Sequence, residues 1–400
     1  MQNPIGLDAL AIAVPEGYLD MGDLAAARGV APSKYTEGLL VSKMAVAKPH
    51  EDPVALAAKA AKRLFETSGA DLSKVGMCVV GTETGVDHSK PVAAYLHRLL
   101  GLPERCRVYE AKHACFGGTV GVLSAIEWIA SGAGKGRTAL IVCTDIARYG
   151  LGTAGEPTQG AGAVALLISE KPRLLTIEPG LDGSYAKDVN DFWRPLYSKD
   201  AVVDGHHSVQ CYLDALAGAY NSFKQAAAEM DHRDALNVAR RCYHVPYGKM
   251  AKKAHRHLMA LEGKTEAEAD ESYNLEVAPS LRIPSQVGNI YTGSLYLALA
   301  SLLDTEAESL EGKRVALFSY GSGCGAEYYV GEVVKGAGAY VKALKLSQPL
   351  ENRRRYTIAE YEAIRQADND VDRKPVEAPQ AAQNEVAFLG VENERRVYKA

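Results

Sequence analysis

Runs of consecutive apolar residues, rich in β-branched side chains, recur along the chain and alternate with segments of helical spacing. Four runs predict buried strands, at Val75–Val80, Ala139–Cys143, Ala163–Ile168 and Val315–Tyr320. Apolar residues at helical spacing predict helices over Ala55–Phe65, Thr119–Ala130 and Leu295–Leu303. Because a strand that is apolar throughout is covered on both faces, the pattern predicts an α/β fold in which helices layer onto a mostly buried sheet.

The pattern changes after about Leu346. A short helical stretch at Ile358–Arg365 is followed by a polar, proline-containing segment at Asp368–Gln383. Apolar character returns at Val386–Leu389 and Val397–Tyr398. We expect residues 346–400 to form an appendage that packs on the body of the protein rather than a separate domain.

Composition narrows the class of protein. The 400 residues include 45 Lys+Arg and 49 Asp+Glu, a net charge of −4, which argues against a nucleic-acid partner. The sequence shows no apolar stretch of membrane-spanning length and no signal-peptide pattern. The seven cysteines form no Cys-x-x-Cys pair, and the histidines lie in no zinc-binding pattern. We expect a cytoplasmic protein without a bound metal.

Glycine-rich turns follow the first and the last of the predicted strands, at Gly81–Gly85 and Gly321–Gly325. Ligands of layered α/β folds often bind at the carboxyl ends of strands, so both turns are candidate parts of a site, although their glycines could serve tight turns alone. Glu83 lies in the first turn, where partial burial would raise its pKa towards that of a useful base. The second turn lacks the spacing and the acidic partner of a dinucleotide-binding loop.

Cys115 is the strongest candidate for a nucleophile. It precedes Phe116-Gly117-Gly118 and the helix predicted from Thr119. The amino end of a helix stabilises a thiolate, so we expect a lowered pKa for this thiol and a capacity to hold an acyl group. The alternative is a small buried packing residue.

Two further polar residues stand at element ends. His244 follows a potential strand at Ala239–Tyr243, from where it could donate a proton to an oxyanion or polarise a carbonyl; it could also be structural. Asn289, ahead of the third predicted helix, could bind a substrate carbonyl or cap the helix. Three lysines downstream of His244 could meet ligand phosphates or form a solvated face: Lys249, Lys252 and Lys253.

Together, the motifs closely resemble those of the 3-hydroxy-3-methylglutaryl-CoA (HMG-CoA) synthases of the thiolase-fold superfamily. The resemblance runs from Ile5 to about Val334 and rests on Lys34–Thr36, Gly81–Asp87, Ala114–Thr119, Asp145–Tyr149, Gly160–Leu167, Asp191–Pro195, Tyr243–Pro246, Gly288–Tyr296 and Tyr320–Gly323. It implies a layered αβαβα fold built from two similar halves, over residues 1–170 and 171–345, with the appendage at 346–400. It also implies a homodimer that needs no cofactor.

The resemblance implies a role for each matching residue. Cys115 would accept the acetyl group, Glu83 would be the general acid/base, and His244 would contact the acetoacetyl group with Asn289 beside it. The backbone amides of Cys115 and Ser322 would form an oxyanion hole. Positions near the family's site are matched by Tyr149, Asp145 and Asp204. Phe116 stands where many members carry tyrosine, which removes one hydroxyl contact.

The thiol that carries the acetoacetyl group distinguishes two branches of this family. One uses coenzyme A to make mevalonate precursors, and the other acts on an acyl carrier protein to install β-branches in polyketides. The chain resembles the second branch at Tyr95–Pro103, Tyr109–His113, Leu350–Arg353 and Arg395–Tyr398, so we expect a carrier-protein substrate, with coenzyme A as the alternative. A basic rim at Lys249–Lys253 would suit the phosphate of either carrier.

Two other classes of protein fit these residues less well. A decarboxylating ketoacyl synthase would pair its cysteine with two histidines, or with a histidine and an asparagine, which the Glu83 turn disfavours. A non-catalytic scaffold that binds a carrier protein is disfavoured by the intact Cys115, Glu83 and His244.

Overall fold

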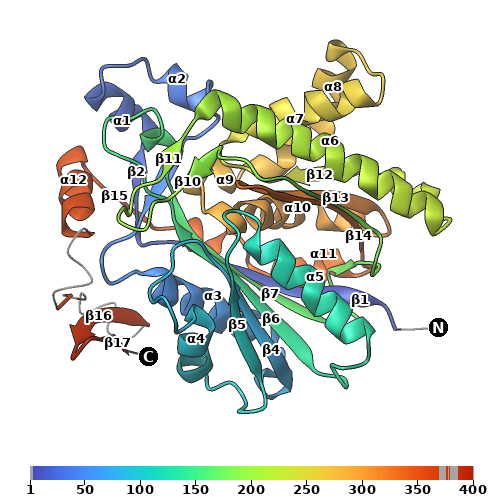
Figure 1. The fold of residues 1–400 in the computed structure, drawn as a ribbon, viewed down its shortest axis with the longest axis horizontal. Helices are drawn as coiled ribbons and strands as arrows, with labels where there is room; N and C mark the ends of the chain where they lie inside the picture. The colour runs from blue at the N-terminus through green and yellow to red at the C-terminus, as the bar shows by residue number, and fades with distance from the viewer. Residues whose placement is uncertain (1–2, 369–374, 377, 379–385, 400) are drawn as a thin grey trace.

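The computed structural model describes residues 3–368, 375–376, 378 and 386–399. Its main feature is a sheet of strand order β12-β13-β14-β8-β1-β7-β6-β4-β5, with β9 also paired to β14 (Figure 1). The two ends of this sheet repeat one arrangement of strands and helices.

The first half of the sheet contains β1 (Ile5–Ala13), β4 (Val75–Gly81), β5 (Arg107–Ala111), β6 (Thr138–Ile146) and β7 (Ala161–Glu170). Strand β4 runs parallel to both β5 and β6. Strand β7 is antiparallel to β6 on one side and to β1 on the other. The carboxyl ends of β4, β5 and β6 therefore meet at one edge.

The second half contains β8 (Leu175–Thr176), β9 (Asp182–Ala186), β12 (Arg240–Tyr243), β13 (Arg314–Gly321) and β14 (Gly325–Val333). Strand β12 is parallel to β13, which forms an antiparallel pair with β14, and β14 is antiparallel to β9. This repeats the relation of β4, β6, β7 and β1. The two halves join where Leu7 of β1 pairs with Leu175 of β8.

The helices form layers on the two halves. Helix α3 (Pro53–Ser68) covers β1, β6 and β7, and α6 (Gly205–Glu229) covers β9 and β14 in the equivalent place. Helices α5 (Gly117–Ala130) and α10 (Ser294–Leu310) lie between the halves (Figure 1). Further helices of the two halves are α4 (Val92–Leu100), α7 (Gly248–Leu261), α8 (Glu266–Glu276) and α11 (Ala337–Leu344). The arrangement is the predicted thiolase-like fold of two similar halves.

Strand β7 shows why its sequence is apolar throughout. Ala163, Ala165 and Leu167 belong to the core beneath α3 and α4. Val164, Leu166 and Ile168, which alternate with them, belong to the core around α5 and α10. Both faces of the strand are therefore buried, as the sequence pattern predicts.

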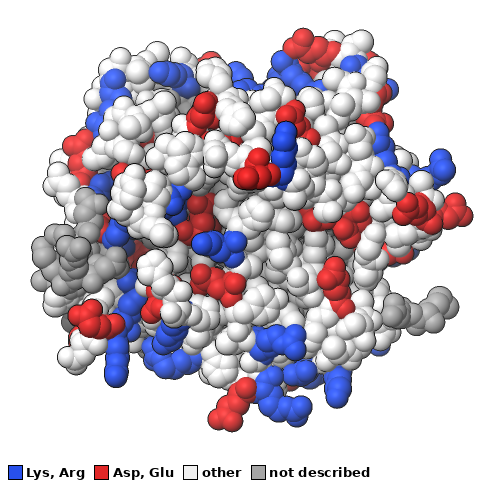
Figure 2. Space-filling model, in the orientation of Figure 1, with Lys and Arg blue, Asp and Glu red and all other residues white. Residues whose placement is uncertain are grey.

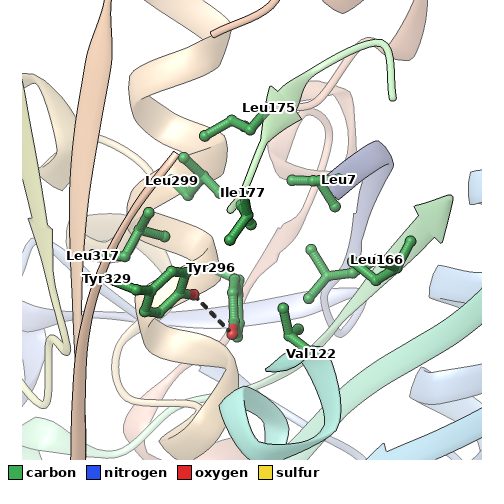
Figure 3. Close-up of a pocket in the computed structure, with 10 residues that line it drawn as sticks. Leu7, Val122, Leu166, Leu175, Ile177, Tyr296, Leu299, Leu317 and Tyr329 are labelled. Atoms are coloured by element: carbon green, nitrogen blue, oxygen red, sulfur yellow. Dashed lines mark hydrogen bonds between the residues drawn. The ribbon is translucent and has the colours of Figure 1, made fainter. Parts of the chain in front are cut away.

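A narrow apolar cavity marks the junction between the halves (Figure 3). Val122 of α5 and Leu166 face residues of the second half, including Leu317 and Tyr329. The hydroxyl of Tyr296 on α10 lies 3.2 Å from that of Tyr329. The lining is almost entirely hydrocarbon and contains none of the candidate catalytic residues, so we assign this cavity to core packing.

The last part of the chain packs on the body, as expected. Strand β15 (Arg354–Arg355) extends a small sheet formed by β2 (Gly17–Asp20) and β3 (Lys43–Val46). Helix α12 (Ile358–Ala367) and the hairpin of β16 (Ala387–Glu392) and β17 (Arg395–Lys399) lie along one side of the molecule, at the left of Figure 1. Most of the predicted polar segment 368–383 lies outside the described residues.

Short elements complete the described fold: α1 (Met21–Ala27), α2 (Ser33–Thr36), α9 (Pro284–Val287), β10 (Phe192–Trp193) and β11 (Val202–Val203). All four predicted strands are confirmed as β4, β6, β7 and β13, and the three predicted helices as α3, α5 and α10. The boundaries at residues 170 and 345 stay predictions. Within the described residues, no helix combines the length and the apolar character needed to cross a bilayer.

Candidate active site

Cys115 lies two residues ahead of α5, in a sharp turn that follows β5. Ala114 takes a left-handed backbone conformation, with φ of 41°, and the Phe116 N–H donates to the carbonyl of His113 at 2.8 Å. The start of α5 is tied to the second half: the N–H of Gly118 donates to Oγ1 of Thr292 at 2.7 Å. These contacts hold the cysteine at the junction of the two halves, with only 9% of its surface exposed.

Glu83 lies in the turn after β4, next to the β5 end from which Cys115 follows. The turn is organised by Asp145 at the end of β6, whose Oδ1 accepts hydrogen bonds from the N–H groups of Glu83 (2.9 Å) and Thr84 (3.0 Å). The hydroxyls of Thr82 and Thr84 donate to the same oxygen. Three neighbouring parallel strands therefore place Glu83, Cys115 and Asp145 together.

The Cys115 thiol donates to Oε1 of Glu83, with 3.7 Å between sulfur and oxygen. Burial raises the pKa of this thiol well above its ordinary value, and the negative charges of Glu83, Asp145 and Asp191 raise it further. The predicted lowering of the Cys115 pKa is therefore wrong. The prediction considered only the helix end and left out burial and the three carboxylates, both of which favour the neutral thiol. The resting sulfur is a protonated thiol facing an acceptor.

Burial also raises the pKa of Glu83, as predicted, and the charge of Asp145 acts in the same direction. Arg194 opposes them, because its positive charge favours the carboxylate. The Arg194 guanidinium donates to the Glu83 carbonyl at 2.6 Å and to Oε2 at 3.2 Å. It also donates to the hydroxyl of Tyr291 at 3.1 Å. Glu83 is thus held between a thiol and a guanidinium.

The loop between β13 and β14 packs against the cysteine turn and carries Ser322. A side chain at Gly321 would place its Cβ 2.6 Å from the backbone N of Phe116, so only glycine permits this approach. Buried Asp191 holds the loop, accepting from the Gly323 N–H at 3.0 Å and from the Tyr320 hydroxyl at 2.7 Å. The backbone of Ser322 is thereby brought beside the turn that carries Cys115. Its role in an oxyanion hole stays a prediction.

His244 directly follows β12, the strand of the second half that corresponds to β4. Its N–H donates to the Phe318 carbonyl at 2.8 Å, and its carbonyl accepts from the Tyr212 hydroxyl at 2.8 Å. Burial lowers the pKa of His244 to about 3, so the imidazole is neutral near pH 7. Nδ1 is buried with no hydrogen-bond partner among the described residues. A neutral imidazole has no acidic extra proton to give but can polarise a carbonyl through its N–H. Of the two roles predicted for His244, polarising a carbonyl is therefore favoured over donating a proton to an oxyanion.

Asn289 precedes α10 as Cys115 precedes α5. Its Oδ1 accepts from the Tyr291 N–H and from the Ser294 hydroxyl, both at 2.9 Å. The oxygen therefore organises the turn ahead of α10 but does not cap that helix, whose N-cap residue is Gly293 without a side-chain cap. A contact between its amide and substrate remains an untested prediction.

Two aromatic residues pack with Cys115. Cys115 packs in a small cluster with Ala147, Tyr291 and Phe192. The ring of Phe192 meets Tyr291 edge to face at 5.8 Å and Tyr149 at 6.3 Å. Tyr149 therefore contacts Phe192, which packs with Cys115. The resemblance implies a position near the active site for Tyr149, and this contact agrees with it.

The remaining predicted residues lie nearer the surface. Asp204 is exposed and caps α6, its Oδ1 accepting from the His207 N–H at 3.1 Å. On α7, Lys249 and Lys253 are exposed, whereas Lys252 pairs with Asp270 at 3.3 Å. Two of the three predicted lysines are therefore exposed, and the third is half-buried and held in an ion pair. Basic and acidic side chains are interspersed on the face shown in Figure 2.

Sequence reasoning missed two residues of the site, Arg194 and Asp191. Both stand in the Asp191–Pro195 motif, which contributed to the resemblance without being given a role. The signal that could have found them is a pair of opposite charges three positions apart within a motif of the resemblance, since opposite charges that close in sequence often act at one site. Among the described residues, no group of three or more His, Cys, Asp or Glu side chains is arranged to hold a metal ion.

A buried thiol beside a carboxylate, at the junction of two similar α/β halves, defines a condensing enzyme of the thiolase-like class. Two family models match the chain: hydroxymethylglutaryl-coenzyme A synthase N terminal over residues 1–172, and hydroxymethylglutaryl-coenzyme A synthase C terminal over 175–270 and 259–387. The chain belongs to the HMG-CoA synthase family, whose enzymes form a carbon–carbon bond.

Known relatives agree with this assignment. Hydroxymethylglutaryl-CoA synthase of Enterococcus faecalis is 39% identical, over 92% of this chain and 94% of the relative. A structure of MvaS in complex with 3-hydroxy-3-methylglutaryl coenzyme A has a TM-score of 0.92 and 48% identity, covering 100% of this chain and 99% of the other. The HMG synthase of the curacin biosynthetic pathway, in complex with a holo donor acyl carrier protein, has a TM-score of 0.91 and 32% identity over 99% of both chains.

Proposed function

We propose that this enzyme joins an acetyl group held on Cys115 to the β-ketone of an acetoacetyl thioester, which gives a 3-hydroxy-3-methylglutaryl thioester. The observation that carries the proposal is the hydrogen bond of the Cys115 thiol to the Glu83 carboxylate at 3.7 Å. A nucleophile and a base in mutual reach are the minimum that such a reaction requires.

The first step is acyl transfer. The sulfur of Cys115 attacks the carbonyl carbon of an acetyl thioester. The bond to the carrier sulfur breaks, and the thiol proton of Cys115 passes to the leaving thiolate, so Glu83 is not required in this step. The products are acetyl-Cys115, a free carrier thiol and an ionised Glu83.

The second step is the condensation. Glu83 removes a proton from the acetyl methyl group, and the resulting carbanion attacks the ketone carbon of the acetoacetyl thioester. The new alkoxide, polarised by the N–H of His244, takes the proton back from Glu83. Donors directed at the enolate oxygen are needed here, since removal of one such donor typically raises a barrier by roughly 3–4 kcal/mol. The backbone amides of Cys115 and Ser322 are the proposed donors.

The third step is hydrolysis. Water adds to the thioester carbonyl on Cys115, the carbon–sulfur bond breaks, and the sulfur recovers a proton. The product leaves with a new carboxylate at one end and its carrier thioester at the other. We propose that no metal or redox cofactor takes part.

We propose coenzyme A as the carrier of both acyl groups. The support is the relation to enzymes named for coenzyme A: the structure that holds 3-hydroxy-3-methylglutaryl coenzyme A is 48% identical, whereas the carrier-protein complex is 32% identical. Exposed Lys249 and Lys253 on α7, with exposed Lys34 on α2, would meet its phosphates. Residues 39–40, which follow α2, pack on the start of α7, so these lysines share one region of the surface.

An acyl carrier protein is the second candidate, and it is the one that the sequence motifs favour. Its support is the curacin HMG synthase, which shares the fold over 99% of both chains and was crystallised with a donor carrier protein. The shared phosphopantetheine arm explains how one site can serve either carrier. The same lysines would then face the acidic surface of the carrier protein.

A comparison of carriers on one enzyme preparation tests both candidates. Cys115 is acetylated with acetyl-CoA, and the acetyl-enzyme is mixed with acetoacetyl-CoA or with an acetoacetyl carrier protein at equal concentration. Coenzyme A is supported if the first reaction has the higher kcat/KM, and the carrier protein if the second does. Failure of both to give a 3-hydroxy-3-methylglutaryl product would contradict the proposed function.

We further propose a cytoplasmic homodimer, as the family resemblance implies. All seven cysteines are free thiols, which suits a reducing compartment. Sedimentation of the purified enzyme tests the dimer, which would be excluded by a monomer mass.

A further inference from the structure

We propose that Arg365, on the C-terminal helix α12, is a positioning residue for the reaction at Cys115, because it holds the backbone of Tyr149, whose ring packs towards the active site. This inference rests on the proposed condensation. The residue lies in the appendage, outside the part of the chain that carries the catalytic motifs.

Arg365 joins two segments that are far apart in the sequence. Its Nη2 donates to the Tyr149 carbonyl at 3.0 Å and to Oδ1 of Asp200 at 3.2 Å. Asp368, just after the helix, forms an ion pair with Arg148, and its backbone carbonyl accepts from Nζ of Lys199 at 3.1 Å. The end of α12 therefore fastens residues 148–149 to residues 199–200.

Tyr361, one turn earlier on α12, holds the same segment from its other side. Its hydroxyl accepts from Nε2 of Gln159 at 2.9 Å and donates to Oε1 of Glu156 at 3.2 Å. The Oε1 atom of Gln159 in turn accepts from the N–H of Tyr149 at 2.8 Å. Both backbone polar groups of Tyr149 are thus held by α12, one directly and one through a buried glutamine.

The held segment leads to the reacting groups through packed side chains. The Tyr149 ring packs edge to face on Phe192, and Phe192 packs likewise on Tyr291. The Tyr291 hydroxyl accepts from Arg194, which binds the carboxylate of Glu83. Every contact in this series is between close-packed or hydrogen-bonded groups, so a shift of the Tyr149 backbone displaces the base.

The size of the effect follows from the geometry of catalysis. A displacement of about 1 Å at a reacting group can cost about 100-fold in rate. Loss of the Arg365 side chain should shift the Tyr149 backbone by less than about 1 Å, because Tyr361 still holds it through Gln159. We therefore expect Arg365→Ala to lower the condensation kcat about tenfold, with less change in the KM of the acetyl donor.

The test separates an effect on the position of the catalytic groups from an effect on folding, because it counts the active sites that can be acetylated. Arg365→Ala, Arg365→Lys and the control Arg355→Ala are purified, and the fraction of Cys115 that accepts an acetyl group is measured by mass spectrometry. Arg355 belongs to the same appendage and pairs with Asp23 at 2.8 Å, on the surface. The condensation kcat is then expressed per acetylated site.

Positioning predicts a tenfold lower kcat per acetylated site for Arg365→Ala, partial recovery in Arg365→Lys, and wild-type kcat in Arg355→Ala. A purely structural Arg365 would reduce the fraction of acetylated sites but leave kcat per site unchanged, and that result overturns the inference. If Arg365→Ala does not fold, Tyr361→Phe answers the same question, since it removes one hydroxyl from the second anchor. An unchanged kcat per site in Tyr361→Phe would likewise overturn the inference.

The wild-type enzyme distinguishes this inference from the proposed function. A wild-type chain that acetylates and condenses, together with an Arg365→Ala variant of equal kcat per site, overturns only the role of Arg365. A wild-type chain that does not condense contradicts the proposed function and the inference with it.

Discussion

The sulfur of Cys115 lies 3.7 Å from a carboxylate oxygen of Glu83. The two residues leave the sheet from adjacent strands: Gly81, at the end of β4, pairs with Ala111, at the end of β5. Because the strands are parallel, both chains turn out of the sheet at the same edge. The pair is therefore a direct product of strand order.

Substitution Glu83→Ala should separate acylation from condensation. The variant should still accept an acetyl group on Cys115, because loss of the carboxylate removes a negative charge that raises the thiol pKa. Condensation should fall by about 10²–10⁴-fold, the usual contribution of a general base. Mass spectrometry of the acetyl-enzyme and turnover assays measure the two steps. Loss of acetylation in Glu83→Ala would show that the base is needed from the first step.

The pH dependence of condensation should reflect the buried base. Since burial raises the pKa of Glu83 and only its ionised form removes the methyl proton, kcat should rise with pH, with a midpoint above the ordinary glutamate value of about 4.3. The groups that face the carboxylate are Arg194, Asp145 and the Cys115 thiol.

Substitution Arg194→Met should shift the midpoint of the rise of kcat with pH to a higher pH. The guanidinium lowers the pKa of Glu83, so its removal leaves burial and Asp145 to raise the pKa further. At a fixed pH near 7 the variant should therefore condense more slowly, and raising the pH should recover part of the rate. A profile of kcat against pH for both enzymes checks this, and an unshifted or downward-shifted midpoint would exclude the assigned role.

The C-terminal hairpin should contribute stability through one buried ion pair. Nη2 of Arg396 lies 2.9 Å from Oδ2 of Asp52 at the start of α3, with side chains only 9% and 7% exposed. Arg396→Met leaves the Asp52 charge buried without its cation, a change that typically costs about 3–5 kcal/mol. We expect a loss of about 3 kcal/mol in the free energy of unfolding, at the lower end of that range, because the Tyr398 hydroxyl still donates to Asp52. Urea denaturation measures this loss. The exposed Arg395→Ala is the matched control, and equal stability of the two variants would refute the prediction.

The strands and the position of the site follow from local sequence. Apolar runs such as the one in β7 are easily recognised in the sequence because both faces of the strand are buried. Glu83 and Ser322 lie in glycine turns directly after such runs. The fold class and the grouping of Glu83 with Cys115 were therefore predictable. The family resemblance supplied the proposed roles.

The electrostatics of the site depend on contacts that the linear sequence does not display. The raised pKa of Cys115 comes from burial and from Glu83, Asp145 and Asp191, which lie on three other segments. A rule based on the helix end alone gave the wrong direction. The contact of Arg365 with Tyr149 spans 216 positions in the chain, and no local pattern marks it.

The most direct test of the account is the mass of the enzyme after brief mixing with acetyl-CoA. Wild-type enzyme should gain one acetyl group, which peptide mapping should place on Cys115, and Cys115→Ser should gain none and should not condense. Addition of an acetoacetyl thioester should then remove the label from the wild-type enzyme as product forms. Equal acetylation of Cys115→Ser, or condensation by that variant at a substantial rate, would contradict the assignment of the Cys115 sulfur as the nucleophile.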